Sequence, residues 1–152
     1  MVTVHDVPAN RLIDEISEKI KEMDQIEMPD WAFFSKTGVH KEKAPVQSDW
    51  WFKRASAVLR SVYLNGPIGV SSLQGKYGGK INRGSKPSRA RKGSGSIIRK
   101  LLQQLEEQGL VKKAENGTGR IITPEGRSLL DNTAHKIMKE MAKDNPELNK
   151  YL

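Results

Sequence analysis

The chain has 152 residues, a formal net charge of +8 at pH 7 and only 36% hydrophobic residues. Its length fits a single domain spanning residues 1–152. No apolar stretch approaches the roughly 20 residues of a transmembrane helix, and no secretory signal is visible at the N-terminus. The absence of cysteine excludes disulfides and thiolate metal sites. We therefore expect a cytoplasmic protein without a membrane partner.

Residues 7–48 are expected to form an N-terminal helix and a long irregular connection. Apolar residues recur at helical spacing between Leu12 and Met23, and charged residues fill the opposite face. The connection carries three aromatic residues, Trp31, Phe33 and Phe34. They are predicted to form a lid over the core, with base stacking as the functional alternative.

The most buried helix is predicted from Trp50 to Leu64, because apolar residues form one continuous stripe along it. Asp49 is the predicted N-cap of this helix. Three basic residues lie off the apolar stripe and are expected to face outward: Lys53, Arg54 and Arg60. The alternative for Arg54, which is close to Trp50 and Trp51 in the sequence, is that it stacks on a ring or braces the fold.

Residues 70–77 are predicted to form a short helix capped by Ser71 or Ser72. The following stretch, residues 78–95, is rich in Gly, Ser and Pro and carries six basic residues. Such a composition cannot bury a core of its own. We therefore expect a mobile loop that is disordered in the free protein and becomes ordered along a nucleic-acid backbone.

The C-terminal third is expected to hold two helices and one small β-hairpin. Residues 96–108 carry an apolar stripe at helical spacing, and Gly109 is the predicted glycine after the helix end. Two short runs, 110–112 and 120–122, flank a turn typical of a hairpin. The last helix is predicted over residues 124–143.

The order helix, short helix, helix, two-stranded ribbon indicates a winged helix, a variant of the helix-turn-helix. The predicted fold class is therefore mainly α, with this core at about 49–123 and one small β-hairpin. The N-terminal helix and loop, 7–48, and the C-terminal helix, 124–143, are expected to pack around the core.

All of the positive excess lies in one block of the chain. Residues 50–105 contain twelve Lys and Arg and no Asp or Glu, whereas residues 1–49 have a net charge of −4 and residues 106–152 a net charge of zero. A concentrated field of one sign is typical of a surface that binds a polyanion. The alternative is a solvated basic surface with no partner.

The helix predicted from Ser96 carries its charges against the helix dipole. Arg99 and Lys100 are near its N-terminus, and Glu106 and Glu107 are in its last turn. This order is favourable if a phosphate binds at the N-terminus, where Gly and Ser leave backbone N–H groups open. The alternative is that these charges pair with neighbouring side chains.

Nothing in the sequence indicates catalysis. The three histidines are far apart, and no Walker A motif, HExxH motif or GxSxG elbow is present. We therefore predict no catalytic residue, no metal site and no cofactor, and a protein that is not an enzyme. The candidate nucleic-acid-binding residues are Lys53, Arg54, Arg60, Lys76, Lys80, Arg83, Lys86, Arg89, Arg91, Lys92, Ser94, Ser96, Arg99, Lys100 and Arg120.

Several strings between residues 49 and 131 match those of a known family, in the right order. They are Asp49-Trp50-Trp51, Arg54-Ala55-Ser56 with Arg60, Gly69-Val70, Tyr77-Gly78-Gly79, Gly95 to Lys100, Leu102 to Glu106, Gly109-Leu110-Val111, and Gly119 to Thr123 with Gly126. On these strings the chain resembles the small-subunit ribosomal protein family S-nineteen-e of archaea and eukaryotes, and its length looks like that of an archaeal member. The resemblance implies a winged-helix core and a structural role in the small (30S) subunit. It also implies binding to rRNA in the head of that subunit, contact with other small-subunit ribosomal proteins, and a part in small-subunit maturation.

The residues leave a second function open, that of a winged-helix transcription regulator that binds DNA. Such regulators usually dimerise to match two half-sites. No helix offers a clean second apolar stripe for dimerisation, so we expect a monomer outside the ribosome. An RNA-processing enzyme is a third possibility, which the missing catalytic motifs disfavour.

Overall fold

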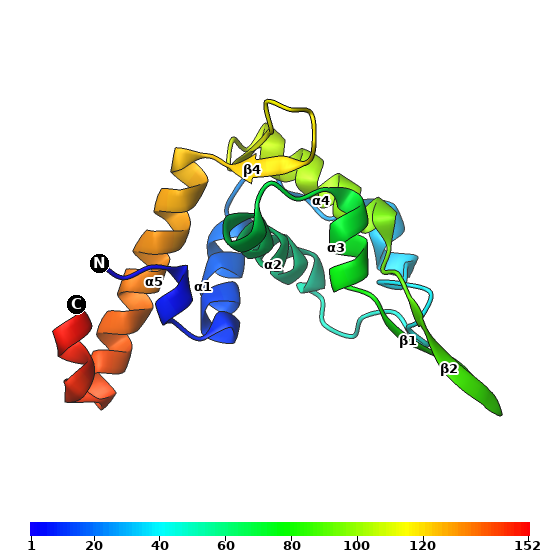
Figure 1. Ribbon diagram of the computed structural model, residues 1–152, viewed down its shortest axis with the longest axis horizontal. Coiled ribbons are helices and arrows are strands. Elements are labelled where there is room, and N and C mark those ends of the chain that lie inside the picture. The colour runs from blue at the N-terminus through cyan, green and yellow to red at the C-terminus, as the bar shows by residue number, and fades with distance from the viewer.

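The computed structural model describes all residues, 1–152, and is mainly helical, as predicted (Figure 1). The α-helices are α1 (Ala9–Lys21), α2 (Trp50–Asn65), α3 (Val70–Lys76), α4 (Gly95–Glu107) and α5 (Pro124–Asp144). Three short 3-10 helices are η1 (Val4–Asp6), η2 (Asp30–Phe34) and η3 (Pro146–Tyr151). Four strands form two separate antiparallel hairpins: β1 (Gly79–Arg83) with β2 (Lys86–Arg91), and β3 (Val111–Lys113) with β4 (Arg120–Ile122).

Helix α2 lies at the centre of the molecule and contacts both α1 and α4 (Figure 1). Eight of its residues are buried, more than in any other helix, as the apolar stripe predicted. Trp51, Val58 and Leu59 have no exposed surface. One cluster of buried side chains joins α2 to η1, α1, α4 and α5. The stripe of α2 is therefore the central layer of the core.

A buried polar link ties α2 to α4 and to the segment after α1. The Trp51 indole Nε1–H donates a hydrogen bond of 3.0 Å to the side-chain oxygen of Gln104. The amide nitrogen of Gln104 donates in turn to the Glu27 carbonyl oxygen, at 2.7 Å. Because an unpaired buried polar group costs about 1–3 kcal/mol, this link fixes how the three segments meet.

The β3–β4 hairpin follows α4 as predicted. Gly109 ends α4 with a φ of +83°, a conformation that favours glycine. Ile68, in the linker between α2 and α3, forms an isolated β-bridge with Arg120 at the edge of this hairpin. The Thr123 hydroxyl then caps α5 by accepting a hydrogen bond from the Gly126 N–H, at 3.2 Å. The hairpin is thus joined to both of its flanking helices and to the linker before α3.

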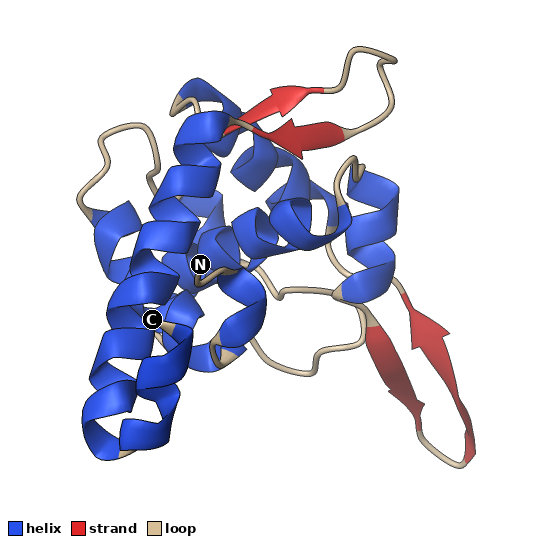
Figure 2. Ribbon diagram, turned by 60° about the vertical axis from the view of Figure 1, so that its left-hand side comes forward, coloured by secondary structure: helices blue, strands red, loops and turns tan.

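The prediction of an irregular loop over residues 78–95 is wrong. These residues contain the β1–β2 hairpin, which projects away from the body of the molecule (Figures 1 and 2). Gly84 makes the turn with a φ of +72°, and its N–H donates to the Asn82 side-chain oxygen at 2.9 Å. Apart from Ile81, the two strands lack the β-branched and aromatic residues that usually mark strands. The fold therefore has two hairpins and not the one that was predicted.

One predicted helix cap is confirmed in position, and the other is wrong. Asp49 is the N-cap residue of α2, as predicted, but its side chain makes no capping bond and instead accepts a hydrogen bond of 3.4 Å from Lys21 on α1. Helix α3 has Gly69 at its N-cap, so Ser71 and Ser72 lie inside its first turn. In the first case a contact between distant segments replaces the local bond that the capping pattern predicts.

Candidate nucleic-acid interface

The β1–β2 hairpin carries five of the candidate basic residues: Lys80, Arg83, Lys86, Arg89 and Arg91. Every residue of β2 is exposed, and residues of β1 alternate between half-buried and exposed. Neither strand contains an acidic residue. Isolated two-stranded hairpins are marginally stable in water, and here like charges add repulsion. The hairpin is thus a cationic arm that a polyanion would stabilise.

The root of the arm is fixed by close contact with α3. The Gly93 N–H donates to the Gln74 carbonyl oxygen at 2.9 Å, and the Gln74 side-chain amide donates to the Gly93 carbonyl oxygen at 3.3 Å. A Cβ on Gly78 would collide with the carbonyl oxygen of Arg91, so the two backbones approach too closely for any side chain there. Helix α3 therefore fixes the position of the root, whereas the strands of the arm make few contacts with the rest of the protein.

The arm leads directly into the N-terminus of α4. The Ser94 hydroxyl caps this helix by accepting a hydrogen bond of 3.4 Å from the Ile97 N–H. Ser96 and Arg99 are exposed and Lys100 is half-buried, with no acidic residue in the first turn. The first two turns of α4 therefore continue the cationic surface of the arm. Two further candidates are exposed at the ends of the arm, Lys76 before it and Lys92 after it.

Arg54 and Arg60 are half-buried on α2 and do not face fully outward. The Arg54 guanidinium carbon lies 4.3 Å from the centroid of the Tyr77 ring, so Arg54 stacks on a ring as the alternative predicted, but on Tyr77 and not on Trp50 or Trp51. The hydroxyls of Tyr77 and Ser61 are 3.0 Å apart and share a hydrogen bond. Burial lowers the pKa of Arg54 and raises that of Tyr77, and the charge of Arg60 opposes the rise. Both arginines therefore lie near the end of α3, next to the root of the arm.

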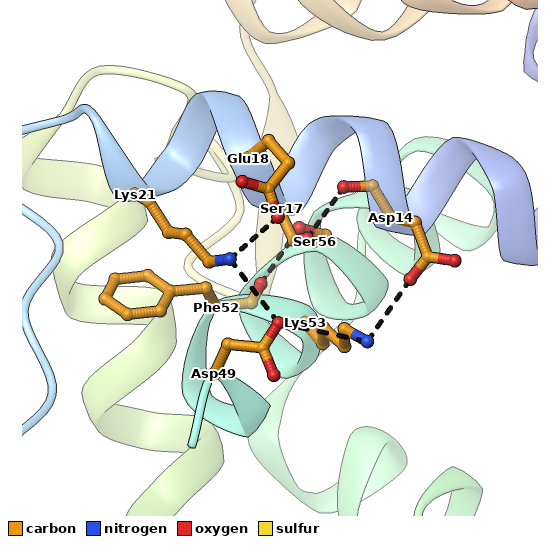
Figure 3. A network of polar contacts seen from close by, with 8 residues as sticks. All are labelled: Asp14, Ser17, Glu18, Lys21, Asp49, Phe52, Lys53 and Ser56. Carbon is orange, nitrogen blue, oxygen red and sulfur yellow. Dashed lines mark hydrogen bonds and ion pairs between the residues drawn. The ribbon is translucent and has the colours of Figure 1, made fainter. Parts of the chain in front are cut away.

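Lys53 faces α1 and not the arm. Its ammonium nitrogen lies 3.5 Å from a carboxylate oxygen of Asp14 and 3.9 Å from one of Asp49 (Figure 3). Lys21 contacts the same Asp49 at 3.4 Å and Glu18 at 2.7 Å. These partly exposed pairs each contribute about 0–1 kcal/mol. They place Lys53 among the acidic residues of the N-terminal segment, so its part in nucleic-acid binding stays a prediction with weaker support.

Arg120 lies at the opposite end of α4 from the cap residue Ser94. Its guanidinium contacts the Glu106 carboxylate at 3.3 Å, and its side chain is only 17% exposed. For Glu106, this pair confirms the alternative in which the acidic residues of α4 have partners inside the protein. The inclusion of Arg120 in the binding set stays a prediction, and its contacts indicate a structural role.

The aromatic residues of η2 do not form one lid. Trp31 packs edge-on against Trp51 with ring centroids 5.8 Å apart, and it remains 42% exposed. Phe33 is 63% exposed and Phe34 is 89% exposed. The predicted lid is therefore confirmed for Trp31 alone. Trp31 also lines a surface hollow of about 430 Å³ that reaches the cap residue Ser94, so exposed aromatic surface adjoins the cationic surface.

Two basic residues outside the predicted set, Lys41 and Lys43, also belong to this side of the molecule. Together with Arg54 they line a surface hollow of about 330 Å³. The Ser94 N–H donates to the Thr37 carbonyl oxygen at 3.0 Å, which brings their segment to the start of α4. The sequence did not reveal them because acidic residues outnumber basic ones in the N-terminal third, and because this contact joins distant parts of the chain.

The remaining titratable residues are scattered. His5 lies beside the ring of Tyr63, His40 lies against Gly38 and Gly79, and His135 is on α5. No group of three or more His, Asp or Glu lies close enough to hold a metal ion. None of the helices combines the length and the apolar character that crossing a membrane requires.

Comparison with known proteins gives consistent matches along the chain. The family model described as Ribosomal protein S19e matches residues 3–140. The small ribosomal subunit protein eS19 of Aeropyrum pernix is 51% identical over 154 aligned residues that cover 100% of both chains. The eS19 of Haloarcula marismortui is 46% identical, with 99% of each chain covered, and the eS19A of Schizosaccharomyces pombe is 42% identical over 91% of this chain and 96% of that protein. The chain therefore belongs to the Ribosomal protein S19e family of small-subunit ribosomal proteins, as its resemblance to that family predicted.

Proposed function

We propose that the protein is a structural constituent of the small ribosomal subunit and binds rRNA through one basic surface. The observation that carries the proposal is the β1–β2 arm, which projects from the body with five basic residues and no acidic one (Figure 2). Contacts with the rest of the protein stabilise such an arm only a little, whereas a bound polyanion would neutralise its charges and stabilise it. Membership in a family of small-subunit ribosomal proteins favours rRNA as that polyanion over the operator DNA of a transcription regulator.

The basic surface comprises the candidates that lie on or beside the arm. These are Arg54, Arg60, Lys76, Lys80, Arg83, Lys86, Arg89, Arg91, Lys92, Ser94, Ser96, Arg99 and Lys100. We expect most of their contacts to be with phosphates, which position a protein on nucleic acid without reading its sequence. Half-buried Arg54 and Arg60 would position the RNA, and the exposed arm would add affinity.

The proposal places this surface on a winged-helix core over about residues 49–123, within a single domain of residues 1–152. It is supported by the order of α2, α3, α4 and the β3–β4 hairpin, and by the bridge from Ile68 to Arg120. In such a core α4 would be the recognition helix. The β1–β2 arm is then an insertion between α3 and α4 that lengthens the binding surface.

The wider role follows from the same proposal. The protein would bind rRNA in the head of the subunit, contact neighbouring small-subunit ribosomal proteins, and take part in subunit maturation. It would be a monomer outside the ribosome, reside in the cytoplasm, and have no catalytic activity and no cofactor.

Crosslinking in cells, followed by sequencing of the attached nucleic acid, tests the proposed function. We expect fragments of small-subunit rRNA from the head, and sedimentation of the protein with the small subunit. A variant in which two glycines replace residues 81–90 is the control, and it should lose most of the crosslinks. Attached DNA, or RNA without enrichment of small-subunit rRNA, would contradict the proposal.

A further inference from the structure

The surface hollow of about 330 Å³ between α2 and the segment that precedes it has an unusual lining. Three basic side chains, Lys41, Lys43 and Arg54, line it together with Trp50. No Asp or Glu is among its lining residues. Glu42 stands between the two lysines in the sequence but does not line the hollow. The hollow is thus positively charged, with no acid within it.

Arg54 has no anionic partner in the protein. None of the ion pairs of the structure involves it, and its close partner is the Tyr77 ring at 4.3 Å. Burial lowers the pKa of Arg54, which indicates that its charge is partly desolvated. Removing a charge from water without a compensating partner is unfavourable. An anion that accepts the hydrogen bonds of this guanidinium would offset that cost.

The walls of the hollow are held by contacts that need no ligand. Trp50 packs edge-on against buried Trp51, with ring centroids 5.5 Å apart. The segment of Lys41 and Lys43 is fixed where the Ser94 N–H donates to the Thr37 carbonyl oxygen at 3.0 Å. Stacking on Tyr77 restrains Arg54 itself. A site that is ordered in advance loses less conformational freedom when it binds.

We propose that this hollow binds one backbone phosphate of the rRNA. Arg54 is a bidentate hydrogen-bond donor to this phosphate, and Lys41 and Lys43 are additional cations beside it. The inference rests on the proposed function, because the bound RNA supplies the phosphate. A planar guanidinium matches two phosphate oxygens, whereas a lysine ammonium acts as a point charge. The RNA contact thereby extends from the basic surface to the segment before α2, which lies outside the acid-free block of the sequence.

The double variant Lys41→Gln with Lys43→Gln tests the site without touching the Arg54 stack, because both lysines are exposed and form no ion pair. Its matched control is Lys139→Gln with Lys143→Gln, which removes the same charge from two exposed residues of α5, on the far side of the molecule (Figure 1). Affinity for a head fragment of small-subunit rRNA is measured between about 50 and 200 mM salt. We expect the Lys41 and Lys43 variant to bind several-fold more weakly, with a salt slope lower by about 1 for one lost phosphate contact. The control should match the wild type.

The outcomes separate this site from the proposed function. If the wild type shows a steep salt dependence and the Lys41 and Lys43 variant has the same affinity and slope, the site is overturned and the proposed function stands. A second outcome also overturns the site: the Lys41 and Lys43 variant binds the RNA fragment as the wild type does but fails to associate with the small subunit. The hollow would then bind an acidic segment of a neighbouring protein. A wild type without any salt dependence would overturn the proposed function itself.

A titration with inorganic phosphate distinguishes an RNA phosphate from a free one. The probe is the NMR signal of the Arg54 side-chain N–H in the free protein. We expect the RNA fragment to shift this signal in the wild type, and to shift it less in the Lys41 and Lys43 variant. A signal that responds to inorganic phosphate but not to the RNA would make the hollow a site for a free anion and overturn the proposal.

Discussion

The Arg54 guanidinium carbon lies 4.3 Å from the centroid of the Tyr77 ring, a contact that joins α2 to the residue at the end of α3. The ring is itself restrained by the hydrogen bond between the hydroxyls of Tyr77 and Ser61. No carboxylate neutralises the arginine, so its charge is both fixed in place and available to a ligand. This relationship distinguishes Arg54 from Lys53, the adjacent residue on the same helix, whose charge is shared with Asp14 and Asp49.

Replacing Tyr77 by leucine removes the surface on which Arg54 stacks. Without this cation–π contact the Arg54 side chain has to be immobilised when RNA binds, at a cost of about 0.5–1.5 kcal/mol. We therefore expect Tyr77→Leu to bind RNA roughly 2- to 13-fold more weakly. Tyr77→Phe is the matched control, because it keeps the ring and loses only the bond to Ser61. Filter binding of both variants to the rRNA head fragment checks this, and an equal loss of affinity in both would contradict the role of the ring.

The Tyr77 phenol also predicts how stability responds to alkaline pH. Burial raises its pKa, against the lowering effects of the Ser61 hydrogen bond and of the charges on Arg54 and Arg60. Because the folded pKa lies above the unfolded value of about 10, the group stabilises the fold fully below that pH, and this contribution is lost as the pH rises through the folded pKa. We expect Tyr77→Phe to remove a late step from the alkaline absorbance titration of the native protein. Loss of an early step would contradict the assignment.

The arm should contribute to binding and little to stability. Replacing residues 81–90 by two glycines removes exposed basic residues from an element that packs on little. We expect the melting temperature to change by only a few degrees and the RNA affinity at moderate salt to fall at least about tenfold, with a smaller salt slope. Thermal melting followed by circular dichroism, alongside RNA binding, checks both statements. A large drop in melting temperature would show that the arm supports the core.

Two arginines should respond in opposite ways to replacement by glutamate: Arg99, near the N-terminus of α4, and Arg120, on β4 beside the C-terminal end of α4. Arg99 is exposed, so Arg99→Glu should leave the melting temperature nearly unchanged, and a carboxylate near a helix N-terminus is itself favourable. Arg120 is paired with Glu106 and mostly buried, so Arg120→Glu should lose about 1.5–3 kcal/mol of stability. Association with the small subunit should fail for Arg99→Glu while its fold is intact. If the melting temperature of the Arg99→Glu protein is as low as that of the Arg120→Glu protein, Arg99 has a structural role and does not belong to the basic surface.

The parts of the fold that follow from periodicity could be predicted from the sequence. The apolar stripe of α2 and the glycine after α4 are both where the pattern indicated. The β1–β2 hairpin could not be predicted, because its strands are held by backbone hydrogen bonds and an Asn82–Gly84 turn, with hardly any strand-forming side chains. Composition indicates whether a segment can be buried in the core. It does not indicate whether two exposed strands pair through backbone hydrogen bonds.

Some residues of the candidate site could likewise be predicted from the sequence, and others could not. The basic residues of the arm lie together because they are close in sequence, so a charge count finds them. Lys53 was included by the same count, whereas Arg120 lies outside the acid-free block. The structure pairs both with carboxylates from other segments of the chain. Lys41 and Lys43 were missed because contacts between distant segments, such as the bond from Ser94 to Thr37, bring them beside Arg54. Such contacts between distant segments carry no local signal.

The most direct test of the central claim, that the basic surface binds rRNA through phosphate contacts, is the salt dependence of wild-type binding. The affinity of the wild-type protein for the rRNA head fragment is measured between about 50 and 200 mM salt. If about six of its basic residues neutralise phosphates, the affinity should fall by roughly 300- to 2,000-fold over that range. An affinity that stays flat across the same range would contradict the claim.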